Sequence, residues 1–363
     1  MKCGIVGLPN VGKSTLFNSL SDAKAQAANF PFCTIEPNIG KVHVPDARLY
    51  ELAELVKPQR VVPATVEMVD IAGLVKGASQ GEGLGNPFLA HIRETNALIH
   101  VLRCFEDDHV AHVDGSVDPV RDKEIVDIEL QLKDLETVVK RLDRVRRAVH
   151  SGDKAAREEW QLLQGIRQHL EAGKSVRSMG FSVADRARMN GFQLLTSKPV
   201  LYVCNVDPGA VKTGNSYTER VEAAVADERA EILVLAVAAE AEIAALDTFA
   251  DRQLFLTDLG LKESGAPQLI RAAYRLLNLQ TYFTAGAEEV RAWTIHSGDR
   301  APQAAGVIHS DFERGFIRAE VIAYGDYIAQ GSAAQVREAG KMRVAGKEYI
   351  VQDGDVMHFR FSV

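Results

Sequence analysis

The segment that most constrains this chain is Gly-Leu-Pro-Asn-Val-Gly-Lys-Ser at residues 7–14, which matches the phosphate-binding loop pattern Gly-x-x-x-x-Gly-Lys-Ser. A β-rich run at 3–6 precedes it, and a helical pattern at 14–20 follows it. The glycines let successive backbone N–H groups turn inward, and the helix N-terminus adds partial positive charge, so such a loop holds the α- and β-phosphates of a nucleotide. The segment therefore predicts an α/β domain that binds a nucleoside triphosphate.

Four residues in and beyond this loop have the chemistry for phosphate and metal binding. The Lys13 ammonium can reach the β- and γ-phosphates, and the Ser14 hydroxyl can coordinate Mg²⁺. The run Asp-Ile-Ala-Gly at 70–73 ends a β-rich stretch, so Asp70 can hold the metal and the Gly73 N–H can meet the γ-phosphate. Asp-x-x-Gly is common by itself, but its position after a phosphate-binding loop makes it specific.

The residue after that glycine is Leu74, where many related hydrolases have a glutamine that orients the attacking water. A leucine side chain neither donates nor accepts a hydrogen bond. Either another group positions the water, or hydrolysis is slow until a partner assists.

Composition and charge exclude several other classes of protein. The 363 residues leave room for two or three domains, and 46% hydrophobic with 25% charged residues is ordinary for a globular protein. No apolar run approaches the roughly 20 residues that cross a bilayer, and the N-terminus has no leader pattern, so we expect a cytoplasmic protein without a membrane partner. The four cysteines show no paired spacing, which argues against a zinc site or disulfides.

The net charge of −7 argues against general attraction to nucleic acid, and we expect no DNA partner. A local exception is the stretch 140–157, which holds seven Lys or Arg against two Asp. Such a run fits a helix tip that faces phosphates, or equally a solvated helical face.

The periodicity of the chain predicts a helical insertion within an α/β domain. Candidate strands lie at 3–6, 61–70, 97–105 and 199–205. Between the last two, apolar residues recur at spacings of three and four on two successive stretches, which predicts an antiparallel helical hairpin. Its apolar stripes are Ile125, Ile128, Leu132, Leu135, Val139 and Leu142, followed after a break at 151–153 by Ala156, Trp160, Leu163, Ile166 and Leu170.

Beyond residue 279, short β-rich runs at 290–295, 315–323 and 355–361 alternate with turns and a helical or irregular stretch at 333–343, which predicts a small α+β module. Three domains are therefore expected. The P-loop domain is discontinuous, at 1–120 and 197–277; the helical insertion is 121–196; and the C-terminal module is 278–363.

The residues that end and follow the candidate strand at 199–205 indicate which nucleotide base, adenine or guanine, the site recognises. Guanine-specific proteins read their base with Asn-Lys-x-Asp, whereas this chain has Asn205-Val206-Asp207-Pro208. Guanine would lose the charged acceptor for its N1–H and amine, at a cost of about 1–3 kcal/mol. Asn205 can instead hydrogen-bond adenine. The segment predicts ATP over GTP.

Five long motifs together resemble the Obg-like ATPase (YchF) family of translation-factor-class P-loop NTPases, and the resemblance extends over essentially the full chain. They lie at 7–15, 29–38, 70–78, 81–86 and 278–286. The chain departs from this family at Pro208, where relatives often carry an acidic residue; this bears on how strongly GTP is rejected.

The resemblance implies roles for individual residues. Thr34 would be the first-switch threonine that ligates Mg²⁺, and 70–73 would be the second switch. Asn10 matches an asparagine that helps to hold K⁺ near the phosphates, and His112 matches a mobile histidine considered as a replacement for the missing glutamine. Residues 278–363 resemble a TGS domain with a β-grasp fold.

The leading hypothesis is a slow ATPase switch that associates with the ribosome, through its large subunit or its RNA, and regulates translation or a stress response. The alternatives are an ATP-gated binding scaffold with incidental hydrolysis and a GTPase in ribosome assembly. Three residues are candidates for catalysis: Lys13, Gly73 and His112. The expected nucleotide contacts are Asn10, Val11, Gly12, Lys13, Ser14, Thr15, Asn205 and Val206, and the expected Mg²⁺ ligands are Ser14, Thr34 and Asp70.

Overall fold

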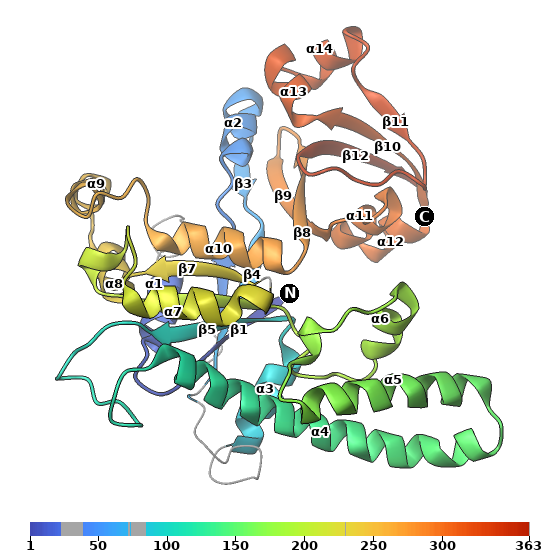
Figure 1. Cartoon of the computed structure of the whole chain (residues 1–363). Helices are drawn as coiled ribbons and strands as arrows, with labels where there is room; N and C mark the ends of the chain where they lie inside the picture. The colour runs from blue at the N-terminus through green and yellow to red at the C-terminus, as the bar shows by residue number, and fades with distance from the viewer. Residues whose placement is uncertain (23–38, 72, 74–84, 229, 363) are drawn as a thin grey trace. The chain divides into compact units, whose positions relative to one another are not determined.

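The computed structural model describes residues 1–22, 39–71, 73, 85–228 and 230–362 (Figure 1). These residues form two compact units. The first comprises Met1–Gly40 and Glu67–Leu269, and the second comprises Lys41–Val66 and Ile270–Val363. These units divide the chain by compactness, whereas the sequence predicts three domains by their motifs and periodicity. The boundaries of those three domains stay a prediction.

The first sheet has the strand order β2-β4-β1-β5-β6-β7. Strands β4, β1, β5, β6 and β7 pair in parallel. Every residue of β5 and β6 is buried, as expected for central parallel strands that are covered on both faces. The bounds are Lys2–Val6 (β1), Ile39–His43 (β2), Thr65–Asp70 (β4), Ala97–Arg103 (β5), Val200–Asn205 (β6) and Glu231–Leu235 (β7).

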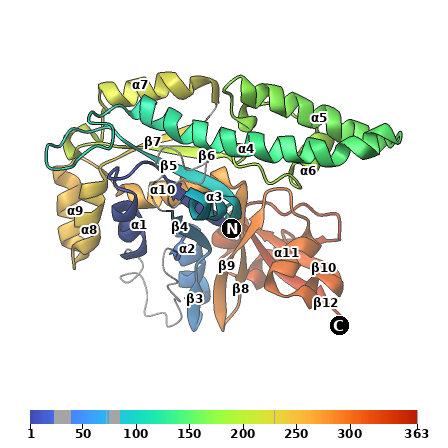
Figure 2. The same ribbon diagram turned by 90° about the horizontal axis from the view of Figure 1, so that it is seen from below.

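Helices lie on both faces of this sheet. Figure 2 shows α4 and α7 along one face and α1 with α8 on the other, and α4 contacts α7 while α1 contacts α8. The α-helices have these bounds: Lys13–Asp22 (α1), Gly85–Glu94 (α3), Pro119–His150 (α4), Lys154–Glu171 (α5), Val183–Met189 (α6), Ser216–Val225 (α7), Val237–Ala245 (α8), Phe249–Asp258 (α9) and Gly265–Leu276 (α10). The 3₁₀ helices among the described residues are Val176–Ser178 (η2), Pro208–Ala210 (η3) and Ala226–Glu228 (η4).

Helices α4 and α5 lie side by side (Figure 1). Each begins at an aspartate that caps its first turn, Asp118 for α4 and Asp153 for α5. The two helices share an apolar core, to which the segment after α5 also contributes. These are Val138 and Leu142 of α4, Leu163, Ile166 and Leu170 of α5, and then Val176, Phe192 and Leu194.

The apolar stripe expected on α4 was partly wrong. Ile128, Leu132 and Val139 are exposed, by 51%, 44% and 37%. The buried face instead contains polar residues such as Asp127 and Asp134, which have charged or hydrogen-bonding partners. Ile125 and Leu142 are buried and Leu135 packs against the shared core, as expected. Spacing alone cannot distinguish a buried paired carboxylate from an exposed one, so it assigned the other three positions to the wrong side.

The single strand expected at 61–70 is also wrong, because it is divided in two. Pro63, which cannot donate to a strand ladder, separates β3 from β4. Strand β4 joins the first sheet, whereas β3 (Arg60–Val62) pairs in parallel with β9 in the second unit.

The second unit contains a mixed sheet in the order β11-β10-β12-β8-β9-β3. Its core packs Tyr282, Phe316 and Phe359 against the alanines of α11. Beside β3, its strands are Leu279–Ala285 (β8), Glu289–His296 (β9), Phe316–Ala323 (β10), Arg343–Ala345 (β11) and Asp355–Phe361 (β12). Its helices are Ala47–Val56 (α2), Ala301–Ile308 (α11), Ser310–Arg314 (α12), Tyr324–Gln330 (α13) and Ala333–Glu338 (α14).

Segment 41–66 is an integral part of this second unit. Helix α2 packs on β8 and β9, Arg48 forms an ion pair of 2.7 Å with Asp353, and the Tyr324 hydroxyl donates to Glu51 at 2.6 Å. Across the residues that the structure describes, no helix has both the length and the apolar character needed to cross a membrane.

Candidate functional site

The loop between β1 and α1 has the backbone geometry of a phosphate cradle. Gly7 and Gly12 have φ values of 148° and 100°, in the region that side chains rarely adopt. A Cβ on Gly7 would lie 2.5 Å from the Val101 carbonyl oxygen, and one on Gly12 would lie 2.7 Å from Asn205 Nδ2. Both positions therefore require glycine, for conformation and for space.

Lys13 lies at the centre of this loop and is buried. Its ammonium donates to the Leu8 carbonyl at 2.6 Å, and a Cβ on Gly73 would lie 3.3 Å from its Nζ. Burial lowers the pKa of Lys13 to about 8, although nearby Asp70 acts in the opposite direction. The structure thus brings Lys13, Gly73 and Asp70 together, and a phosphate would provide the ammonium with an anionic partner.

Ser14 and Asp70 also meet, although 56 residues separate them. The Ser14 hydroxyl donates to Asp70 Oδ2 at 2.8 Å, while Asp70 Oδ1 is buried and has no hydrogen-bond partner in the described part of the chain. A hydroxyl and an orphaned carboxylate oxygen fit Mg²⁺, which takes one or two protein ligands beside phosphate and water. The third expected ligand, Thr34, lies outside the described residues, as does Leu74.

The described residues hold no group of three or more His, Cys, Asp or Glu arranged as a metal site.

Asn205 braces the loop from the end of β6. Its Nδ2 donates to the Val11 carbonyl at 2.9 Å, and its Oδ1 accepts the Val237 N–H at 3.0 Å. Val206 is buried next to it and continues the strand ladder to Leu235. The sequence reasoning predicted a contact with the base and missed this brace, because a residue 194 positions from its partner leaves no local signal.

The other predicted nucleotide contacts lie on the loop itself. Asn10 has a positive φ of 60°, and its Nδ2 donates to the Ala111 carbonyl at 3.1 Å. Ser14 and Thr15 are exposed at the start of α1. The Asn10 bond joins the loop to the segment that carries His112.

His112 is held by groups of its own segment and of α4. Its side chain is 5% exposed, with Nε2 2.8 Å from Asp122 Oδ2, and its Nδ1 accepts the Asp114 N–H at 3.1 Å. Because Nδ1 accepts, the proton of the neutral ring lies on Nε2 and is donated to Asp122. In this arrangement both ring nitrogens are engaged, so the ring would have to leave Asp122 to position a water.

A buried ionic cluster beneath α4 was not expected from the sequence. Lys123 contacts Asp127 and Glu228, both at 2.7 Å, and Arg177 contacts Asp127 at 2.9 Å and Glu228 at 3.2 Å. Burial acts to raise the pKa of Asp127, but Arg177 and Lys123 outweigh it and keep that pKa below its usual range. The cluster joins α4 to η2 and η4. Lys123 and Asp127 are an i,i+4 pair on α4, but Arg177 and Glu228 lie about 50 and 100 residues further along the chain, so no local motif could have revealed the cluster.

Comparisons with known proteins match both ends of the chain to family models. Residues 2–141 match a family described as 50S ribosome-binding GTPase, and residues 279–362 match the family YchF-GTPase_C, described as a protein of unknown function.

Whole-length relatives are also found. The chain is 53% identical to "Ribosome-binding ATPase YchF" of Bacillus subtilis over 365 residues, which cover 100% of both chains. It is 44% identical to "Obg-like ATPase 1" of Gallus gallus, covering 100% of this chain and 92% of the relative. Among solved structures, the YchF GTPase of Schizosaccharomyces pombe aligns with a TM-score of 0.90 at 39% identity, covering 99% of this chain and 97% of that one.

Proposed function

Since this chain belongs to the YchF family of Obg-like ATPases, we propose that it is an ATP-binding, slowly ATP-hydrolysing switch that uses Mg²⁺ and associates with the ribosome. The observation that carries the proposal is the convergence of Lys13, Gly73, Ser14 and Asp70 on one glycine loop. These groups suit phosphoryl transfer, where catalysis is mostly positioning and charge stabilisation.

Each of these groups has a separate task in the proposal. Lys13 would leave the Leu8 carbonyl for the β- and γ-phosphates, and Ser14 and Asp70 would hold Mg²⁺. The bound Mg²⁺ supplies positive charge next to the phosphate oxygens. Asn205 holds the loop in shape through its two hydrogen bonds. Exchanging Ser14 for alanine should therefore raise the Mg²⁺ concentration needed for half-maximal ATP binding.

The proposed slow turnover is explained by the hydrogen bond that holds His112 against Asp122. The ring must leave Asp122 before it can orient water, and that exchange breaks a short hydrogen bond inside a nearly closed environment. A partner that draws α4 or the 106–118 segment into another position would favour release of the ring.

ATP is the proposed nucleotide, although the matched family and the yeast relative carry the word GTPase in their descriptions. Val206 is buried, and Pro208 begins η3 where a guanine-reading carboxylate would be needed. Competition binding of ATP and GTP tests this assignment, and tenfold tighter GTP would refute it.

Helices α4 and α5 are proposed to be the inserted antiparallel hairpin, and residues 278–363 the TGS-type β-grasp module. In the mixed sheet of the second unit, β12 and β8 pair in parallel while β8 and β9 pair antiparallel, which supports the second assignment. These two parts would carry the contacts to the ribosome, through the large subunit or its RNA, and so affect translation or a stress response. A cytoplasmic location is part of the same proposal.

The decisive experiment measures ATP turnover by the full chain with Mg²⁺, with and without ribosomes, in K⁺ and in Na⁺. We expect stimulation by ribosomes and faster turnover in K⁺, with the K⁺ effect reduced in Asn10→Ala. Absence of ribosome binding in every nucleotide state would contradict the proposed association.

An ATP-gated scaffold is the second candidate, and the engagement of both His112 nitrogens favours it. In that case ATP would change ribosome binding, but ribosomes would leave turnover unchanged.

A further inference from the structure

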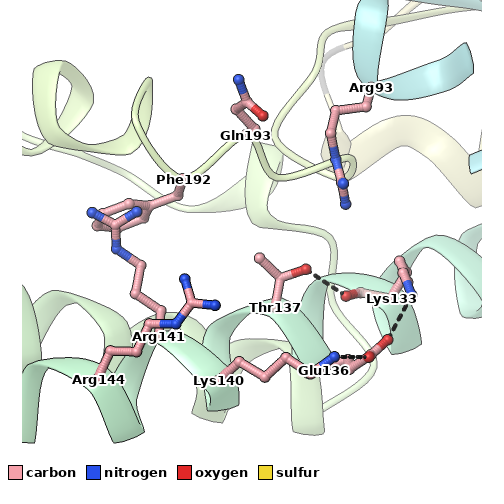
Figure 3. A pocket seen from close by; sticks show the side chains of 9 residues that line it. All are labelled: Arg93, Lys133, Glu136, Thr137, Lys140, Arg141, Arg144, Phe192 and Gln193. Carbon is pink, nitrogen blue, oxygen red and sulfur yellow. Dashed lines mark hydrogen bonds and ion pairs between the residues drawn. The ribbon is translucent and has the colours of Figure 1, made fainter. Parts of the chain in front are cut away.

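A pocket of about 350 Å³ lies in the first unit beside α4, away from the residues of the glycine loop (Figure 3). Its lining includes five cationic side chains and a single carboxylate: Arg93, Lys133, Lys140, Arg141, Arg144 and Glu136. The pocket is therefore a local concentration of positive charge in a chain whose net charge is −7.

Three of these five cations already have anionic partners. Glu136 accepts hydrogen bonds from Lys133, at 2.7 Å, and from Lys140. These bonds lower the pKa of Glu136 to about 2, so it stays ionised. Arg141 Nε donates to Glu159 at 2.6 Å.

The other two cations are unpaired. Neither Arg93 nor Arg144 forms an ion pair with any residue that the structure describes. They come from different elements, Arg93 from the end of α3 and Arg144 from α4, and Figure 3 shows Arg93 approaching from the side opposite α4. Two guanidinium groups thus face one hollow from two sides, and neither forms an ion pair with a described residue.

The wall that faces α4 is held in place. Asp134 of α4 accepts the N–H groups of Leu195 and Thr196, both at 2.7 Å. The Arg141 guanidinium stacks over the Phe192 ring at 4.3 Å. Between these anchors Gln193 has a φ of 51°, uncommon for a non-glycine residue, and its carboxamide forms no hydrogen bond with a described residue. The pocket is therefore preformed and presents a polar group beside its free charges.

We propose that this pocket binds two adjacent phosphate groups, with Arg93 and Arg144 as the principal contacts. Arginine binds phosphate oxygens through paired N–H groups, and the volume is in the range of pockets that hold small ligands. Neighbouring phosphates occur in an RNA backbone and in a free diphosphate, and both present this chemistry. Lys140, Arg141 and Arg144 also begin the basic run that continues to Arg157, so a longer phosphate chain would meet further cations beyond the pocket.

For an RNA backbone the inference rests on the proposed function, because the pocket lies on α4, which belongs to the hairpin proposed to contact the ribosome. For a free diphosphate it goes beyond that function. Both forms can be measured without ribosomes and without turnover, so failure of the pocket and failure of ribosome association are distinguishable.

The test uses the full chain with its glycine loop saturated by a non-hydrolysable ATP analogue and Mg²⁺. Inorganic pyrophosphate is titrated by calorimetry, and a short single-stranded RNA by fluorescence anisotropy at several salt concentrations. The variants are Arg93→Gln and Arg144→Gln. The matched control is Arg146→Gln, which removes the same charge from an exposed position of the same helix outside the pocket.

We expect each pocket variant to weaken binding by about tenfold or more, because hydrogen bonds between charged groups are strong. The control should stay within about twofold, because Arg146 does not line the pocket, although all three arginines are exposed. Glu136→Gln, which removes the only carboxylate of the lining, should tighten binding. Unchanged ATP turnover in all four variants would show that each is folded.

The two ligands separate the two sources of phosphate. Loss of pyrophosphate binding in the pocket variants identifies a site for a free diphosphate. Loss of RNA binding alone, with the dependence of log K on log salt reduced by about one, identifies a backbone site. If neither ligand binds, or if both bind the pocket variants as tightly as Arg146→Gln, the proposal is overturned, whatever the ribosome experiment shows.

Discussion

At the scale of single residues, two candidate catalytic side chains are already hydrogen-bonded to groups that the sequence did not indicate. Lys13 donates to a carbonyl of its own loop, and His112 donates to Asp122. Both contacts must be exchanged for contacts to nucleotide or water before catalysis, and each exchange can be measured.

Lys13 makes ATP binding depend on pH. Burial lowers the pKa of the free lysine to about 8, while a triphosphate next to it raises that pKa again. Below about pH 8 the ammonium is already charged, so affinity should be flat. Above that pH, binding must take up a proton, and ATP affinity should fall as pH rises.

Calorimetry in buffers of different ionisation enthalpy measures this uptake directly. Proton uptake should appear above about pH 8 and vanish well below it. An affinity that is constant across this range, with no proton taken up, would contradict a lowered pKa for Lys13 in the free protein.

His112→Ala tests the water-positioning role. If the ring orients water after it leaves Asp122, its loss should lower kcat by roughly 100-fold and leave ATP affinity unchanged. His109→Ala, in the same segment and exposed, serves as the control and should have nearly normal turnover. Full turnover in His112→Ala would remove the residue from the mechanism.

At the scale of elements, α4 is the helix on which several features meet. Its first turn holds Asp122 against His112, its next turn contributes to the buried ionic cluster, and its middle lines the basic pocket. A displacement of α4 would therefore act on all three, which supports it as the element that would couple a partner to the nucleotide site.

The ionic cluster should make a large contribution to holding α4 in place. Arg177→Met leaves Asp127 and Glu228 with one fewer counter-charge in a buried environment, and we expect a loss of about 3–5 kcal/mol in the free energy of unfolding. Arg167→Met breaks the exposed Arg167–Glu171 pair instead, which should cost about 1 kcal/mol or less. Urea denaturation followed by circular dichroism compares the two, and equal effects would show that the buried cluster has no special weight.

At the scale of the whole molecule, segment 41–66 belongs with the C-terminal residues in one compact unit. Strand β3 pairs with β9, and α2 packs on β8 and β9. A C-terminal module that starts at 278 therefore lacks an edge strand and a helix that its sheet has in the full chain.

A fragment of residues 278–363 should consequently be less protected than the same residues in the intact protein. Its β9 backbone would lose the pairing of Glu289, Val290 and Arg291 with β3. Hydrogen exchange should show faster exchange at β9 in the fragment and little change at β10, whose partners β11 and β12 are retained. Equal protection of β9 in both forms would support an independent module with the boundary predicted from the sequence.

The sequence alone determined the features that depend on neighbouring residues. The glycine loop, the strand and helix around it, the two long helices and the family could be recognised because turn geometry, periodicity and motifs are local. The tertiary structure decided what depends on residues far apart in the chain. In the folded chain Asn205 is hydrogen-bonded to the loop, and His112 is hydrogen-bonded to Asp122. The buried face of α4 contains paired carboxylates. Strand β3, which ends before Pro63, pairs in the second sheet and not in the first. The physical reason is that hydrogen bonds, ion pairs and burial join groups only after folding brings them together, and no local pattern encodes which distant partner each group will meet.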